Sequence, residues 1–486
     1  RFDSFMLQLL LGGSGSGKTT LLYQRIRARA EKGEKSILLV PEQFTSSTEG
    51  RIYRELGDAL SGMVESFSFT SLAEKILSTE GGAAVQTLSD AGRAVLVRRA
   101  LEELQDNVHY YHRHRRSAAF CQMAAQTIDE LKSAGLSGQQ LAQLAGACGA
   151  ESGKLSELAL IFQGYETLLA RSGMDPSDRL ELAGARLEEA LARHSLPEFL
   201  RDRAVFIDEF DTFNAPKKRL LGAMLAALPS VTVALCDDGA PLLPGDLSLF
   251  SGAKQVAAQL RQLARKNGAE VAVPQLLRKD LRHRNAPGLA AVAELLETGS
   301  CTADAPAGEV RLFAAPSREE EARAAAGAIR RLMRQGVRCG KIAVVCRDIA
   351  KYRAAVRYEF RMAEIPLYCD EPTTPEFSAP ATAVRALLEI ARGADLTENL
   401  TTLAKTGLCA LSEEQVCALE NYAYTWAPTA AAWREKFERS PKGFGEQELT
   451  EEDLRNRERA EYARALLVWA VDAFRAKVRE VNAEAI

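Results

Sequence analysis

The 486-residue sequence predicts an α/β protein, in which parallel sheets are flanked by helices. Short apolar runs typical of buried parallel strands occur at residues 5–11, 36–40, 203–207 and 231–236. Segments with helical periodicity separate these runs. The first run leads directly into a glycine-rich loop and then a helical pattern, which is the order of elements around a phosphate-binding loop.

The glycine-rich loop matches the pattern G-x-x-x-x-G-K-[ST] at every fixed position. Backbone N–H groups of such a loop point at phosphate oxygens, and the N-terminus of the following helix adds partial positive charge. Lys18 is expected to reach the β- and γ-phosphates, and the Thr19 hydroxyl to ligate Mg²⁺. The predicted ATP site consists of Gly12, Gly13, Ser14, Gly15, Ser16, Gly17, Lys18, Thr19 and Thr20. The alternative is a glycine-rich turn that binds nothing.

The chain between the loop and residue 84 continues the β/α pattern. Pro41 ends the second apolar run, and a further strand is predicted at residues 63–67. The next helix is predicted to begin with Thr70 or Ser71 as its N-cap, with Glu74 completing a capping box.

Residues 85–200 predict an all-helical insertion, because they are rich in Ala, Leu, Gln and Arg and poor in β-branched residues. Residues 110–116 (YYHRHRR) form a basic, aromatic cluster that would suit a nucleic-acid backbone or a stacked base. A solvated loop or helix end is the favoured alternative. His109, His112 and His114 have no acidic or thiol neighbour, so no metal site is predicted there.

The β pattern returns in an apolar strand that ends in Asp208 and Glu209. In an ATPase with a phosphate-binding loop, the first carboxylate holds Mg²⁺ through water, and the second orients and deprotonates the attacking water. Asp208 is therefore a predicted Mg²⁺ ligand with Thr19, and Glu209 the catalytic residue if hydrolysis occurs. The alternative is an acidic strand end that faces solvent.

A second β/α region is predicted after residue 300, with strands at residues 309–313 and 341–347. The helix between them carries glutamates in its first turn and arginines in its last, which suits the helix dipole. The predicted domains are 1–84 (first domain with the phosphate-binding loop), 85–200 (helical insertion), 201–300 (rest of the first domain), 301–395 (start of a second domain) and 396–486 (its helical insertion, truncated).

The composition limits the function classes. The net charge of −3 means that any nucleic-acid contact must come from local basic patches. Nine cysteines are scattered without a C-x-x-C spacing, which indicates reduced thiols and a cytoplasmic protein. No apolar run approaches the ~18 residues of a membrane span, so no membrane partner is predicted.

The two β/α regions, the first interrupted by helices, resemble the two RecA-like motor domains of a superfamily 1 helicase. Residues 66–73 resemble the segment that runs along single-stranded DNA in this superfamily. The resemblance implies DNA contacts, by motif position, at Phe44, Thr45, Thr70 and Ser71. A core aromatic is the alternative for Phe44. Residues 282–284 (RHR) are a further basic patch, for which a solvated turn is favoured.

A closer resemblance rests on the run LVPEQFT at residues 39–45 and the runs KTGLCALSEEQV and LENY at residues 405–416 and 419–422. These runs are similar to the AddB (RexB) family, over essentially the whole chain. The resemblance implies a cytoplasmic heterodimer with an AddA-like helicase–nuclease subunit. That complex acts on single- and double-stranded DNA, processes double-strand breaks for recombination and responds to a Chi sequence.

The AddB resemblance also implies that this half is not the main motor and contributes to Chi recognition. The nuclease domain and a cysteine-ligated 4Fe-4S cluster belong to the family's C-terminal half, and no residue of this chain is assigned to either.

One departure from an active motor follows the strand that ends near Cys236. A glutamine-containing motif is expected there, but the sequence is Asp237, Asp238, Gly239 and Ala240. Binding of Mg-ATP is therefore predicted, whereas hydrolysis coupled to movement is left open. The hypotheses are an AddB-type nucleotide- and DNA-binding subunit, a self-sufficient superfamily 1 translocase, and a non-hydrolysing P-loop scaffold for a protein partner.

Overall fold

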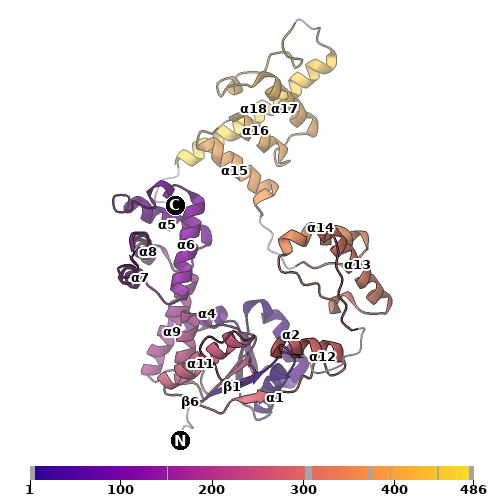
Figure 1. Cartoon of the computed structure of the whole chain (residues 1–486). Helices are drawn as coiled ribbons and strands as arrows, with labels where there is room; N and C mark the ends of the chain where they lie inside the picture. The colour runs from indigo at the N-terminus through magenta and orange to yellow at the C-terminus, as the bar shows by residue number, and fades with distance from the viewer. Residues whose placement is uncertain are drawn as a thin grey trace. The chain divides into compact units, whose positions relative to one another are not determined.

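The computed structural model describes residues 6–149, 152–300, 309–369, 375–394, 396–445 and 448–480 (Figure 1). Contacts divide the chain into two compact units, one that ends at Leu312 and one that starts at Phe313. The first residue of the predicted strand at 5–11 lies outside the described residues, as does the predicted domain boundary near residue 301.

The first unit is built on a seven-stranded sheet, in which every pair of neighbouring strands is parallel. The order is β3-β2-β4-β5-β1-β6, and β7 also pairs with β1. The strands are β1 (Met6–Gly12), β2 (Ser36–Leu39), β3 (Val64–Phe67), β4 (Ala204–Ile207), β5 (Ser230–Cys236), β6 (Glu270–Val271) and β7 (Gln275–Leu277). The predicted α/β class with a parallel sheet is confirmed.

Helices cover both faces of this sheet, because side chains alternate along each strand. In β1, Leu10 packs in one core with helices α1 and α2, whereas Leu7, Leu9 and Leu11 pack in the other with α4, α9, α10 and α11. The bounds are α1 (Lys18–Ala30), α2 (Thr45–Leu56), α4 (Phe69–Glu80), α9 (Pro176–Ala192), α10 (Ala215–Ala227) and α11 (Ser251–Lys266). The short α3 (Asp58–Ser61) follows α2, and α12 (Pro287–Thr298) follows β7.

The segment between β3 and β4 is helical, as expected for residues 85–200. Its helices before α9 are α5 (Asp90–Glu103), α6 (Ala118–Ser133), α7 (Gly138–Ala145) and α8 (Ser152–Ser172). They share a core of their own that includes the fully buried Val97 and Phe162. Figure 1 shows these four helices beyond α9, away from the sheet.

The start of α4 differs from the prediction that placed the N-cap at Thr70 or Ser71. The N-cap is Ser68, whose hydroxyl accepts a hydrogen bond from the Ser71 N–H at 3.1 Å. The Ser71 hydroxyl in turn accepts from the Ser68 N–H at 2.8 Å. The prediction was wrong because Phe69, which is 2% exposed, must lie in the first helical turn to reach the core. Glu74 pairs with Arg179 of α9 instead of closing a capping box.

All regular secondary structure described in the second unit is helical. Its helices are α13 (Arg318–Arg334), α14 (Ile349–Met362), α15 (Ala379–Ala391), α16 (Leu396–Lys405), α17 (Glu413–Trp426) and α18 (Glu451–Glu480). The helices α13 and α14 share one small core, and α15–α18 surround a second core around the fully buried Trp433. None of the helices described in either unit has the length and apolar character that a membrane span requires.

The strands predicted at residues 309–313 and 341–347 are not formed, and this part of the prediction was wrong. Leu312 is 101% exposed and Val345 is 91% exposed, so neither segment is buried. A strand is stabilised by hydrogen bonds to neighbouring strands. Within the described residues, neither segment has a strand beside it. The second RecA-like domain therefore stays a prediction.

Candidate nucleotide-binding site

The loop between β1 and α1 has the backbone shape that binds phosphate. Gly15 and Gly17 adopt φ values of +79° and +90°, which residues with a Cβ atom rarely adopt. Gly17 is also the N-cap of α1 and has no side chain to bond the first N–H groups of the helix. Those N–H groups are therefore left for an anionic ligand, which the helix dipole also favours.

Lys18 lies folded over this loop. Its ammonium donates hydrogen bonds to the carbonyl oxygens of Gly12 and Gly13, both at 2.8 Å. These bonds hold the positive charge beside the loop. A phosphate oxygen would offer the ammonium a charged acceptor, which forms a stronger hydrogen bond than a neutral carbonyl does.

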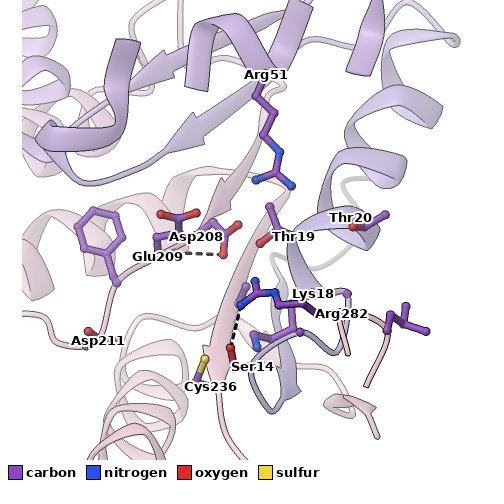
Figure 2. Close-up of a pocket in the computed structure, with 15 residues that line it drawn as sticks. Ser14, Lys18, Thr19, Thr20, Arg51, Asp208, Glu209, Asp211, Cys236 and Arg282 are labelled. Carbon is purple, nitrogen blue, oxygen red and sulfur yellow. Dashed lines mark hydrogen bonds between the residues drawn. The ribbon is translucent and has the colours of Figure 1, made fainter. Parts of the chain in front are cut away.

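The predicted Mg²⁺ and catalytic carboxylates lie across a cavity of about 480 Å³ from the loop. Figure 2 shows the Thr19 hydroxyl on the loop side and Asp208 and Glu209 opposite. The volume is in the range of small-ligand sites. Of the predicted residues, the cavity brings together Ser14, Gly15, Gly17, Lys18, Thr19, Thr20, Asp208 and Glu209.

The remaining predicted loop residues line a second cavity on the other side of the loop. Gly12, Gly13 and Ser16 lie there, together with Asp237. A Cβ atom at Gly12 would come within 2.5 Å of the Ser16 hydroxyl and 2.6 Å of the Leu277 carbonyl oxygen. The absence of a side chain at Gly12 therefore allows the loop to pack closely against β7.

The two carboxylates have different environments. Asp208 is 6% exposed, whereas Glu209 is exposed at the edge of the cavity. Partial burial, together with the negative charge of Asp208, raises the pKa of Glu209, and Arg51 opposes this shift. A carboxylate with a raised pKa is a better proton acceptor, which suits the role predicted for Glu209.

Two arginines of this site were not predicted from the sequence. The Arg282 guanidinium donates to the Ser14 hydroxyl at 3.2 Å, and the Leu281 N–H donates to the Gly15 carbonyl at 3.0 Å. Arg282 is exposed in a bend after β7, as the solvated-turn interpretation expects, and its side chain also contacts the loop. Arg51 of α2 lines the same cavity. The sequence marked Arg282 only as part of a basic patch, and no local pattern marks Arg51.

Asp237 stands where an active motor has its glutamine-containing motif. It does not line the cavity that contains Thr19. Its N–H donates to the Gly12 carbonyl at 3.3 Å, and its carboxylate accepts from the Gly239 N–H at 2.7 Å. The side chain is 2% exposed, and this burial raises its pKa. Asp237 therefore holds a turn behind the loop.

The four predicted DNA-contact residues follow β2 and β3, at the same edge of the sheet as the loop. Phe44 is half-buried against the α1/α2 core and borders a cavity with Thr19 and Glu209. The Thr45 hydroxyl donates to the Glu42 carbonyl at 2.8 Å. Thr70 is exposed, and Ser71 is exposed but bonded in the α4 cap.

The basic cluster at residues 110–116 has an internal partner. The carboxylate of Glu157 accepts hydrogen bonds from the N–H groups of His109, Tyr110 and Tyr111, at 2.9, 2.8 and 3.2 Å. These bonds hold the backbone of the cluster as a loop, which favours the structural alternative. In the part of the chain that is described, no group of three His, Cys, Asp or Glu side chains is arranged to hold a metal ion.

Comparison with known proteins identifies the family. A family model described as "ADDB, N-terminal" matches residues 9–293. The B subunit of the ATP-dependent helicase/deoxyribonuclease of Desulforudis audaxviator is 32% identical over 446 residues, which cover 88% of this chain and 37% of that protein. The proteins of the same name from Symbiobacterium thermophilum and Clostridium perfringens are 31% and 27% identical, over 88% and 96% of this chain and 38% and 41% of their own lengths.

This chain thus spans about two fifths of the length of these relatives. The family model covers more than half of the chain, across the loop, β4 and the helices between them. The chain belongs to the AddB family of helicase/deoxyribonuclease subunits and carries its N-terminal domain.

Proposed function

We propose that this chain is the ATP- and DNA-binding, helicase-like portion of an AddB subunit. Its partner is an AddA-like helicase–nuclease subunit, and the heterodimer processes double-strand DNA breaks for recombinational repair in the cytoplasm. The names of the relatives, which are B subunits of an ATP-dependent helicase/deoxyribonuclease, support this proposal. The contribution to Chi recognition comes from the family resemblance.

The observation that carries the nucleotide function is the shared cavity of Lys18, Thr19, Asp208 and Glu209. Lys18 and the loop N–H groups would hold the phosphates, and Thr19 and Asp208 would hold Mg²⁺. The bound metal would neutralise charge on the phosphate oxygens. The positive φ values of Gly15 and Gly17, and the first turn of α1, which has no side-chain cap, fit such a ligand.

The proposed role of this subunit is to bind nucleotide and DNA while the partner acts as the main motor. The turn made by Asp237 supports the proposal that this subunit is not the main motor. The segment after β5 contributes no amide side chain to the cavity. The carboxylate pair still keeps the groups that hydrolysis requires. The nuclease activity and the 4Fe-4S cluster are assigned to the longer part of the family protein.

Nucleotide binding tests the proposal directly. Isothermal titration calorimetry with Mg-ATP should show binding to the chain, and Lys18→Ala should abolish it. Lys32→Ala, an exposed lysine just after α1, is the matched control and should bind as the parent chain does. Absence of binding in the unsubstituted chain would contradict the proposal.

The rate of ATP hydrolysis distinguishes the AddB-type subunit from a self-sufficient translocase and from a P-loop scaffold. Weak ATP hydrolysis, with little response to single-stranded DNA, is expected for the isolated chain. Strong DNA-stimulated hydrolysis that Lys18→Ala removes would instead identify a self-sufficient translocase. ATP binding without DNA binding would identify a P-loop scaffold.

DNA binding is tested by its salt dependence. Contacts to the phosphate backbone release counterions, so affinity for single-stranded DNA should fall steeply between low and moderate salt. Thr70→Ala, an exposed position on the proposed path, should lower this affinity without unfolding α4. An affinity that barely changes with salt would contradict backbone binding.

A further inference from the structure

We propose that Arg51 recognises the terminal phosphate of the bound nucleotide and makes the site prefer a nucleoside triphosphate to a diphosphate. The inference rests on the proposed nucleotide function and goes beyond it, because it assigns the preference to one side chain outside the predicted motifs. The position, the contacts and the charge of Arg51 each support it.

Arg51 lies in α2, two turns beyond the start of the helix at Thr45. Its side chain lines the cavity that Thr19, Asp208 and Glu209 also line. Figure 2 shows the guanidinium directed toward the side chain of Thr19. Arg54, one turn further along the same helix, does not line this cavity and borders only the adjoining one.

The guanidinium of Arg51 is held in place but keeps its hydrogen-bonding capacity. It lies over the ring of Tyr23, 4.9 Å from the centroid, and Tyr23 is itself only 4% exposed. Among the described side chains and backbone groups, none forms a hydrogen bond or an ion pair with Arg51. A stacked guanidinium presents planar N–H donors that match the oxygens of a phosphate. Arg51 therefore has its donors free for a ligand.

The other cations of the site lie on the loop side of the cavity. Lys18 is bonded to the carbonyl oxygens of the loop, and Arg282 to the Ser14 hydroxyl. Both would act on any nucleotide whose phosphates lie in the loop. Arg51 instead approaches from α2, on the side of the cavity where Asp208 and Glu209 bring two negative charges.

A terminal phosphate would add negative charge on the side of the cavity that Asp208 and Glu209 line. Beyond the charge that Mg²⁺ would neutralise at Asp208, these carboxylates would repel the third phosphate more strongly than the second, since electrostatic repulsion falls with distance. Arg51 offsets this repulsion only for the nucleotide that carries the third phosphate. The Asp237 carboxylate is bonded within its turn and does not reach the cavity. In this proposal Arg51 therefore contacts the terminal phosphate in place of the glutamine that an active motor would use.

The test compares affinities for ATP and ADP, each with Mg²⁺, in the chain as it stands and in Arg51→Gln. The unsubstituted chain should prefer ATP. Arg51→Gln should lose about tenfold or more in ATP affinity, the expected effect of one charge-assisted hydrogen bond, and change ADP affinity by less than about twofold. Arg54→Gln, the same substitution one turn away, should keep both affinities. Arg51→Lys should restore part of the preference.

The readout is the ratio of the two affinities, which a purely structural role would leave unchanged. An equal loss of ATP and ADP affinity in Arg51→Gln would overturn the assignment, since it would show that stacking on Tyr23 merely supports the fold. Retention of the ATP preference in Arg51→Gln would also overturn it, while leaving the nucleotide function intact. Failure of the unsubstituted chain to bind either nucleotide would overturn both proposals.

Discussion

The backbone N–H of Glu209 donates a hydrogen bond to the Oδ1 atom of Asp208 at 3.0 Å, so that both carboxylates stand at the end of β4. Glu209 reaches this arrangement with a left-handed φ of 64°. That conformation costs a residue with a Cβ atom about 1–2 kcal/mol. The strain brings the second carboxylate to the cavity instead of continuing the strand, which is the behaviour expected of a functional position.

Glu209→Gly should therefore be more stable than Glu209→Gln by about 1 kcal/mol, because glycine removes the backbone strain and glutamine keeps it. Both variants lack the negative charge, so the difference between their stabilities reports the cost of the backbone conformation at residue 209. Thermal unfolding followed by circular dichroism measures it. All three tryptophans, Trp426, Trp433 and Trp469, lie in the second unit, so tryptophan fluorescence provides an internal control that should not change. Equal stabilities would show that the strain is not stored in Glu209.

Gly15→Ala should weaken both the fold and nucleotide binding. A Cβ atom at Gly15 would come within 2.7 Å of the Cβ atom of Arg282. Gly33→Ala is the matched control, since Gly33 has a φ of +77° but no heavy atom within 4 Å of the added carbon. Gly15→Ala should lose about 1–3 kcal/mol more than the control in urea unfolding. Only Gly15→Ala should reduce ATP affinity in calorimetry, and a similar reduction in Gly33→Ala would contradict this account.

Arg282→Ala should lower ATP and ADP affinity together, by about fivefold to tenfold, because its guanidinium binds the loop that holds the phosphates common to both. This equal effect distinguishes Arg282 from Arg51. Arg284→Ala removes the same charge two residues later, from a side chain that does not line the cavity, and should change neither affinity. The loss at Arg282 should shrink with added salt, because the site is open to solvent. Equal behaviour of the two variants would show that residues 282–284 act only as a solvated turn.

Asp237 should make the first unit less stable as the pH rises. Burial raises its folded-state pKa above the unfolded value of about 3.9. The folded chain therefore binds the proton more tightly, and the destabilisation develops as the pH rises from the unfolded pKa through the folded one. Asp237→Asn keeps an acceptor for the Gly239 N–H and loses this dependence. Relative to the parent chain, the variant should gain stability between pH 4 and pH 7, measured by circular dichroism with tryptophan fluorescence as the control. A difference that does not change with pH would contradict the predicted shift.

The sequence predicted those features of this protein that depend on neighbouring residues. The loop at residues 12–19 is recognised because glycine spacing, a preceding strand and a following helix are all local. The strand that ends at Asp208 and Glu209 is similarly evident, because apolar residues and acidic residues meet at one point of the chain. The buried strands β1, β2, β4 and β5 were predicted for the same reason.

Features that depend on partners distant in sequence were predicted less well. The strands expected at residues 309–313 and 341–347 have the right composition but no described neighbour to pair with. The cap of α4 moved to Ser68 because burial of Phe69 outweighed the local preference for Thr70 or Ser71. In both cases local chemistry permits several outcomes, and packing or pairing with other segments selects one.

The sequence by itself determined the class of the fold, the glycine-rich loop and the carboxylate pair, since each depends on a short stretch of chain. Only the tertiary structure decided which cations surround the cavity. Arg282 comes from a segment 268 positions from Ser14, and Arg51 from a helix that no motif includes. Sheet order and helix packing place them there, and no local pattern records a distance across the fold. The structure thus supplied the residues on which nucleotide preference is now proposed to depend.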